Sequence, residues 1–273
     1  MTDIETRAQP QHELVLRTLN LELRQSSMPI SDTDDPRDVL SRAREFAKQG
    51  DFGTALEHFQ WFHENALKIR PSLKGVRLSF ALKDWLKLAQ KHPPAMEALQ
   101  TTRDRAVKRL FSADGTQSDF KEIAAIDWAQ DSESNVCDLY EALASSNANL
   151  ARQCQWRAFE PLARQKRFLV ARKCMWSPRR FVTWEVNQLN ARLSDDFAIL
   201  HPELKVAHTH FFVEKMNLIG EVMKESGERW AANVVIMAGT RRIKYPDVRL
   251  AVYVSLYSRF SDHSYWRKSS TNQ

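Results

Sequence analysis

Four side chains around residue 210 are of the types that bind zinc, namely His201, His208, His210 and Glu214. Residues two apart on a helix point about 200° away from each other, so His208 and His210 cannot share one ligand face. His210 and Glu214, four residues apart, can share a face. Two ligands do not make a metal site, and we therefore expect packed or interfacial histidines and no bound metal.

Sequence motifs for hydrolysis are missing from the chain. There is no Gly-x-Ser-x-Gly, no His-Glu-x-x-His and no phosphate-binding glycine loop, and Ser, Cys and His occur without activating neighbours. An enzyme would need a site assembled from distant residues, seen in a structure as a pocket where titratable groups converge. We predict no catalytic residues and no cofactor, and keep an unrecognised hydrolase as one alternative.

Charge is the strongest chemical asymmetry along the chain. Residues 152–180 hold nine basic side chains against the single acid Glu160, whereas residues 127–147 hold five acids and no base. Two such segments can neutralise each other or stay solvated, and the basic one can also bind an acidic partner. Nucleic acid is a further alternative, since a formal charge of +6 and a pI near 9.3 permit it, although no base-reading motif is present.

Composition favours an all-α protein in a reducing compartment. Only 7 glycines occur in 273 residues, too few for the turns of sandwiches and barrels or for a dinucleotide-binding loop. The N-terminus lacks the apolar run of a secretory signal, and no stretch approaches the ~18 apolar residues of a membrane span. Cys137, Cys154 and Cys174 fit neither a disulfide framework nor a zinc site, so we expect reduced, packed thiols. These features predict a soluble cytoplasmic protein with no membrane contact.

Turn signals divide the chain into helices. Asp35 and Pro36 favour a helix start, Gly50 ends that helix, and a long second helix should run from Phe52 to the residues before Pro71. Further helices are expected over about 73–91, 95–110, 120–128, 136–143, 150–162, 168–175, 178–193, 202–219 and 248–257. We predict a mobile leader over 1–34, a helical domain over 35–257 that divides into subdomains 35–176 and 177–257, and a loose tail over 258–273.

The segment around Gly50 joins two helices in a distinctive way. A glycine turn is followed by Phe52, by Ala55 three residues later and by Phe59 four residues after that, and all should be buried with Phe46 and Leu56. This pattern resembles the middle of a tetratricopeptide repeat, and residues 168–175 repeat its spacing. The resemblance covers about 35–175 and, more faintly, 207–242. It implies an all-α stack of antiparallel helical hairpins, a right-handed solenoid whose first helices line a concave groove for a peptide or protein segment.

The resemblance also indicates which side chains face that groove. Counting from the aligned hairpin places Trp156 in the groove with polar groups one turn away, a natural hot spot for a peptide ligand. Arginines nearby suit bidentate pairing with carboxylates. The same counting exposes Leu40 in the first hairpin, among cations that do not reproduce the family's two-carboxylate clamp. The predicted partner-binding residues are Trp156, Gln153, Arg152, Arg157, Glu160, Arg164, Arg37, Arg44 and Lys48.

We therefore predict a non-catalytic interaction protein, a scaffold that binds an acidic and partly apolar peptide or protein segment. A nucleic-acid-binding protein using the surface of residues 152–180 is the first alternative, and the hydrolase is the second. Two structural interpretations also stand beside the binding prediction: Trp156 can belong to the core, and the arginines can neutralise the acidic segment before them.

Overall fold

The computed structural model describes residues 30–31, 34–194 and 201–260, with side chains described as far as Leu256. All regular structure in these residues is helical and none is strand, which confirms the all-α prediction. The chain forms two compact units that meet in sequence between Asp131 and Ser132, except that the short segment Gly115–Gln117 belongs to the second unit. The predicted subdomain boundary at 176 and 177 falls inside the second unit. Residues 1–29 of the predicted leader and 261–273 of the predicted tail lie outside the described residues.

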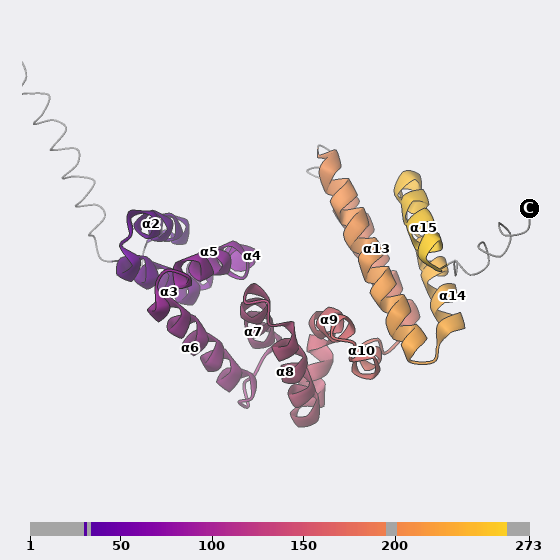
Figure 1. The fold of residues 1–273 in the computed structure, drawn as a ribbon, viewed down its shortest axis with the longest axis horizontal. Coiled ribbons are helices and arrows are strands. Elements are labelled where there is room, and N and C mark those ends of the chain that lie inside the picture. Colours follow the sequence, from indigo (N-terminus) through magenta and orange to yellow (C-terminus); the bar gives the residue numbers. More distant parts are fainter. Residues whose placement is uncertain (1–29, 32–33, 195–200, 261–273) are drawn as a thin grey trace, which may run out of the picture. The chain divides into compact units, whose positions relative to one another are not determined.

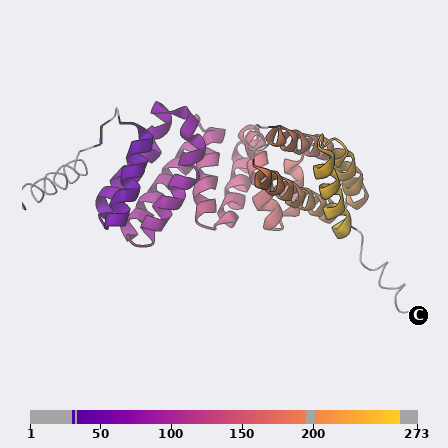
Figure 2. The same cartoon turned by 90° about the horizontal axis from the view of Figure 1, so that it is seen from above.

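The first unit contains six α-helices and a 3₁₀ turn in its described residues. Within it α2 lies against α3, and α5 contacts both α3 and α6 (Figures 1 and 2). In the described part of the whole chain, no helix combines the length and apolar character needed to cross a bilayer. The elements of this unit are α2 (Pro36–Gln49), α3 (Phe52–Ile69), η1 (Pro71–Leu73), α4 (Lys74–Arg77), α5 (Phe80–Ala89), α6 (Pro93–Leu110) and α7 (Gln117–Ala129).

Local chemistry sets the ends of the first hairpin. The Asp35 carboxylate accepts the backbone N–H of Arg37 at 2.9 Å, which caps the start of α2. Gly50 ends α2 with φ of 86°, a left-handed conformation that glycine adopts without steric cost. The Asp51 side chain then accepts the Thr54 N–H at 3.2 Å and caps α3. Both helices have the bounds predicted from the sequence.

The core of the first unit lies between this hairpin and α5. Phe46, Ala55 and Phe59 are buried as predicted, whereas Phe52 and Leu56 are only partly buried against the same cluster. The ring of Trp85 stacks on Phe59 with centroids 6.5 Å apart, and its indole N–H donates to the Ala95 carbonyl at 2.9 Å. Burial of aromatic surface with the polar atom satisfied is a strongly stabilising arrangement.

The single helix predicted over 73–91 is wrong, because the structure breaks it into η1, α4 and α5. Ser79 lies at the break, and its hydroxyl donates to the Gly75 carbonyl at 2.7 Å. Such a local bond competes with the helical ladder, and glycine adds to the weakness of this stretch. The break leaves Arg77 free to turn toward α3 and α7.

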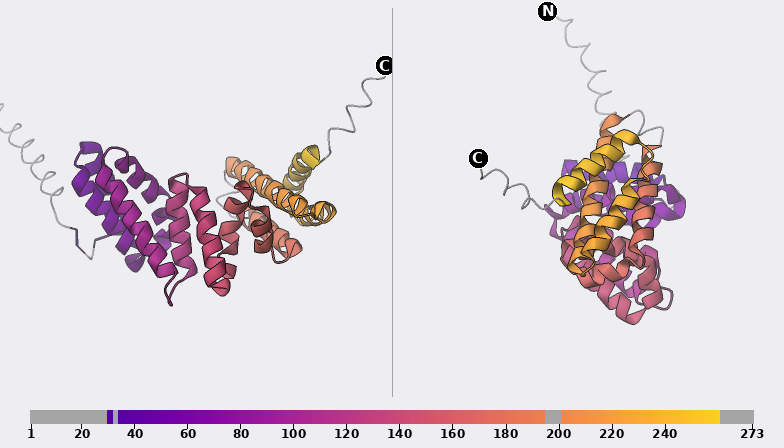
Figure 3. Two further views of the ribbon diagram at one scale, coloured as in Figure 1. Left: turned by 60° about the horizontal axis from the view of Figure 1, so that its bottom comes forward. Right: turned by 90° about the vertical axis from the view of Figure 1, so that its right-hand side faces the viewer.

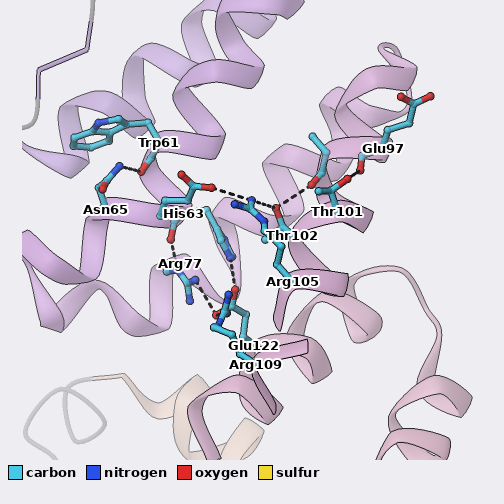
Figure 4. A network of polar contacts seen from close by, with 12 residues as sticks. Trp61, His63, Asn65, Arg77, Glu97, Thr101, Thr102, Arg105, Arg109 and Glu122 are labelled. Carbon is cyan, nitrogen blue, oxygen red and sulfur yellow. Dashed lines mark hydrogen bonds and ion pairs between the residues drawn. The ribbon is translucent and has the colours of Figure 1, made fainter. Parts of the chain in front are cut away.

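A buried polar network ties α3, α4, α6 and α7 together around Glu122 (Figure 4). His63 Nε2 lies 3.0 Å from one Glu122 oxygen, and Arg77 lies 3.0 Å from the other. Arg109 approaches the second oxygen at 3.4 Å, and Arg77 also donates to the His63 carbonyl at 2.5 Å. Burial lowers the pKa of His63, so a neutral imidazole donates to the carboxylate. Burial alone would raise the pKa of Glu122, but His63 and Arg77 lower it to about 2.

The second unit contains seven helices in its described residues. Helix α13 contacts five of them, α9, α10, α11, α14 and α15, and the orange to yellow helices of this unit lie close together in Figure 3. Helix α8 packs mainly on α9. The helices are α8 (Glu133–Ser146), α9 (Ala148–Arg164), α10 (Phe168–Cys174), α11 (Pro178–Leu193), α13 (Pro202–Glu225), α14 (Arg229–Thr240) and α15 (Pro246–Phe260).

One glycine permits the close contact between α11 and α14. A Cβ atom added at Gly239 would lie 2.2 Å from Cγ1 of Val182, a fully buried and β-branched side chain. Valine has few alternative rotamers in a helix, so the contact can be relieved only by moving a helix. The sequence analysis did not single out Gly239, since nothing in its local pattern shows the approach of α11.

We expect Gly239→Ala to destabilise the protein. Overpacking of this kind costs about 1–3 kcal/mol, more than the ~1 kcal/mol that alanine gains in helix propensity. The free energy of unfolding, from urea titration, should therefore fall. The double variant Gly239→Ala with Val182→Ala should lose less than the sum of the two single losses, and strict additivity would refute the steric explanation.

We also expect Glu122→Gln to lower the free energy of unfolding by about 3 kcal/mol at pH 7, because Arg77 loses its charged partner in a buried site. The pKa of Glu122 is depressed, so its contribution is present above about 4.5 and disappears as the pH falls toward 2. The gap between variant and parent should thus narrow between pH 7 and pH 3 in urea titrations. Glu97→Gln, on exposed α6 surface, is the matched control. An equal loss in the control, or a gap independent of pH, would contradict the role of this network.

Candidate functional site

Helix α9 carries most of the predicted partner-binding residues. The Asn147 side chain caps it by accepting the Leu150 N–H at 3.0 Å. Its apolar stripe, which includes Cys154 and Phe159, is buried in the second unit. The remaining face carries the predicted residues Arg152, Gln153, Trp156, Arg157, Glu160 and Arg164.

Trp156 joins α9 to α11 through aromatic contacts. Its ring is stacked on Phe181 with centroids 4.2 Å apart, and it lies 4.3 Å from the ring of Trp184. Phe181 is fully buried, whereas Trp184 is 40% exposed and Trp156 is partly exposed. The pair Trp156 and Trp184 therefore connects the core to the surface. We call it the aromatic pair.

The arginines of α9 fall into two groups. Arg152 and Arg157 are exposed, and no carboxylate of the described residues pairs with either. Gln153 is also exposed, and its backbone carbonyl accepts a hydrogen bond from the side-chain amide of Gln117. Arg164 is different, because its guanidinium contacts Glu133 at 2.8 Å and Glu160 at 3.6 Å.

Acids of α8 neutralise part of the basic segment that follows. Glu133 pairs with Arg164, and Arg167 contacts both Asp138 at 2.6 Å and Glu141 at 3.0 Å. The attraction between acidic and basic segments, one of the two structural interpretations, is thus present for these residues. Arg172 pairs with Glu228 of the second unit at 2.6 Å. Arg152, Arg157, Lys173 and Arg179 are exposed, and no carboxylate of the described residues forms an ion pair with them.

Glu160 takes part in a triad that links three helices. The ammonium group of Lys215, on α13, lies 2.7 Å from Glu160 of α9 and 2.7 Å from Glu185 of α11. Burial favours the neutral form of Lys215, but the two carboxylates outweigh it and raise its pKa. Burial also raises the pKa of Glu185, against the opposing effect of Lys215. Lys215 is therefore protonated at neutral pH and links α9, α11 and α13 through its two ion pairs.

The triad lies in a cleft between α9, α11 and α13 with a volume of about 210 Å³. Leu189 and Phe212 are the buried apolar part of its lining, and Phe211 is 60% exposed at the cleft. Its other polar residues include Gln188 and Arg192 of α11 and His208 of α13. The aromatic pair adjoins this cleft, because Trp156 and Trp184 each precede a lining residue, Glu160 or Gln188, by one helical turn.

A second hollow, of about 310 Å³, lies between α13 and α15; its lining includes His210, the charged residues Lys205 and Asp247, and apolar residues such as Val213. His208 and His210 therefore face different hollows, as the helical geometry requires. His210 contacts Glu214 at 3.3 Å. Nowhere in the described residues do three or more His, Cys, Asp or Glu side chains gather as metal ligands.

Titratable groups do converge in the α9–α11–α13 cleft, the feature that a catalytic interpretation needs. The residues that line this cleft include no Ser, Thr or Cys, so no hydroxyl or thiol of these types is present as a nucleophile. The two carboxylates keep Lys215 protonated, and a protonated amine is not nucleophilic. All three cysteines are buried and none forms a disulfide, as predicted. Burial raises the pKa of Cys137 and of Cys174 to about 11, which keeps both as unreactive thiols.

The predicted residues of the first hairpin lie on α2, in the first unit. Arg37 is exposed, Arg44 contacts Asp84 at 2.7 Å, and Lys48 contacts Glu45 at 3.3 Å. The prediction that Leu40 is exposed is wrong, because it is only 4% exposed and belongs to the core. Leu40 lies on the buried stripe of α2 together with Val39 and Ala43.

The sequence analysis missed the part of the site contributed by α11 and α13. Trp184, Gln188 and Arg192 are spaced by four residues and so share one face of α11, a signal that was present but not used. On α13 a charge at Lys215 interrupts a stripe that also contains Phe211 and Leu218. A lysine in such a stripe indicates a buried ion pair, but the sequence does not show which carboxylates pair with it.

Comparisons of the chain with protein-family models, with curated proteins and with solved structures give no match. The functional argument accordingly rests on the geometry of the second unit.

We expect Lys215→Met to lower the free energy of unfolding by about 3 kcal/mol at pH 7, because two carboxylates are left facing each other in a largely buried site. Glu185 already has a raised pKa, and loss of the ammonium raises it further. A raised carboxylate pKa stabilises the protonated protein, so the deficit should shrink as the pH falls from 7 to 5. Lys224→Met, on the exposed face of α13, should change stability little. If urea titrations showed equal effects of the two substitutions, the stabilising role of Lys215 between the two carboxylates would be contradicted.

Proposed function

We propose that the protein is a non-catalytic interaction protein, a cytoplasmic scaffold that binds a segment of another protein on its second unit. The observation that supports this most is the partly exposed aromatic pair, in which Trp156 of α9, the helix that also carries the unpaired Arg157, contacts Trp184 of α11. Tryptophan and arginine are the residues most enriched among binding hot spots. A side chain anchored by stacking loses little entropy when a partner covers it.

We further propose that the helical hairpins belong to a right-handed solenoid of the tetratricopeptide type. The hairpin of α2 and α3, with its Gly50 turn and buried Ala55 and Phe59, supports this, as does the pairing of α9 with α10. In such a stack each hairpin buries its apolar face on its neighbour, and the first helices are left to contact a partner. Helix α9 is the first helix of its hairpin and carries Trp156.

Charge supports an acidic partner. Arg152 and Arg157 are exposed without a carboxylate among the described residues, although their neighbours Arg164 and Arg167 are paired. Unpaired guanidinium groups beside an aromatic surface favour a segment that carries Asp or Glu together with apolar side chains. The binding free energy would come from the aromatic pair, and the charges would guide orientation and association rate.

A specific observation also favours a second candidate, binding of single-stranded nucleic acid. The guanidinium of Arg180 lies 5.0 Å from the ring of Trp176, which is 56% exposed, and Lys173 and Arg179 are exposed nearby in sequence. Exposed aromatic rings beside cations stack on bases and contact phosphates. We favour the protein partner because the aromatic pair is held by a packed core, whereas Trp176 stands in a short connection between α10 and α11.

We expect the double variant Arg152→Glu with Arg157→Glu to lose the specific partners of the parent protein. Both arginines are exposed and unpaired, so the fold should survive, unlike a reversal at Arg164, which would break contacts with Glu133 and Glu160. The measurement is affinity capture from lysate of the native host, with and without nuclease treatment, followed by quantitative mass spectrometry. Lys91→Glu with Lys108→Glu, exposed positions of the first unit, makes the same change in charge and is the control.

The three outcomes separate the candidates. Partners that bind the parent and the control but not the double variant support a protein segment on α9. Partners that bind all three equally contradict the proposed surface. Capture that disappears on nuclease treatment, or that weakens log-linearly with salt, would favour nucleic acid over a protein segment.

A further inference from the structure

Most charged side chains of the cleft between α9, α11 and α13 have a partner at ion-pair distance, whereas Arg192 has none and acts on Glu185 only through its charge. Lys215 is paired with two carboxylates, Arg164 contacts Glu133 and Glu160, and Glu214 contacts His210. Arg192 lines the same cleft and is exposed, and none of the carboxylates of the described residues pairs with it. A guanidinium in this position can still form a bidentate contact with an incoming carboxylate.

Two further polar groups lie in the lining with Arg192. Gln188 precedes it by one turn on α11, and its amide can donate to the same oxygen atoms. His208 lines the cleft from α13, and its Nδ1 is buried with no hydrogen-bond partner among the described residues. Buried polar atoms without a partner are uncommon in folded proteins and invite a ligand.

The size and charge of the cleft narrow the class of ligand. Its volume of about 210 Å³ is below the roughly 300–1,000 Å³ of pockets for cofactors and drug-sized molecules, and fits one or two side chains. Glu160, Glu185 and Glu214 also line it, which disfavours a doubly charged phosphate relative to a single carboxylate. The exposed ring of Phe211 offers an apolar surface beside the polar groups.

We propose that Arg192, with Gln188 and His208, binds the carboxylate of an Asp or Glu side chain in a partner peptide while a neighbouring apolar side chain of that peptide packs on Phe211. This inference rests on the proposed function and specifies the recognition at its site.

Helical geometry extends the proposal to a spacing. Trp184 and Arg192 lie on one face of α11, eight residues or about 12 Å apart along the axis. An extended peptide advances about 3.3 Å per residue, so about four of its residues cover that distance. The peptide should therefore carry a second large apolar residue about four positions from its acid, in contact with the aromatic pair.

The test begins with a display library of random twelve-residue peptides selected on the full chain. We expect enrichment of Asp or Glu beside a large apolar residue, with a second apolar residue about four positions away. One enriched peptide and its acid-to-amide version, Glu→Gln or Asp→Asn, are then titrated by fluorescence anisotropy against the parent, Arg192→Ala and the control Arg249→Ala. Arg249 is an exposed arginine on α15 outside the cleft lining, and no carboxylate of the described residues pairs with it.

We expect Arg192→Ala to lower the affinity for the acidic peptide at least about tenfold. Arg249→Ala should change this affinity by less than about twofold. The amide peptide should bind the parent protein about as weakly as the acidic peptide binds Arg192→Ala. Its affinity should not fall further when it is titrated against Arg192→Ala. This non-additivity would demonstrate that Arg192 contacts the acid directly. Selected peptides that bind equally well to Arg192→Ala and Arg249→Ala would overturn this inference and leave the proposed function standing. Failure of the library to yield any binding peptide would count against both.

Discussion

Lys215 holds three helices of the second unit in a fixed relation, since its ammonium group on α13 contacts one carboxylate on α9 and another on α11. Removing such charges from water costs several kcal/mol per ion, and only close geometry with mutual neutralisation offsets that cost. Apolar packing alone tolerates small rotations of a helix, whereas a 2.7 Å contact to each of two carboxylates does not. Because α13 also contacts α10, α14 and α15, the arrangement of much of the unit depends on this triad.

The triad also fixes the charged wall of the cleft. The Lys215 ammonium group lies between Glu160 and Glu185, so these charged groups hold one another in position. The groups left over, Arg192 and Gln188, lie on the face of α11 that also presents Trp184. In the function that we propose, this fixed arrangement reduces the ordering cost when a partner segment binds.

A buried charge network also holds helices of the first unit together, but there a carboxylate is at the centre and cations surround it. Glu122 is a single carboxylate among Arg77, Arg109 and a neutral His63, and it links segments that are far apart in sequence. Arg103 and Asp127 add a second buried pair between α6 and α7, with the guanidinium donating to the carboxylate at 3.0 Å. Asp127 begins the acidic segment, so its charge is used inside the first unit, whereas the later acids of that segment neutralise arginines of α9 and its following turn.

The sequence by itself determined the features that depend on near neighbours. Asp35 with Pro36, Gly50 and Pro202 mark helix ends through local capping and backbone geometry, and glycine poverty identified an all-α chain. Tertiary structure alone decided the burial of Leu40, the close approach at Gly239 and the partners of Lys215. These depend on which helix faces which. That relation arises from contacts between residues tens of positions apart, for which a helical period carries no information.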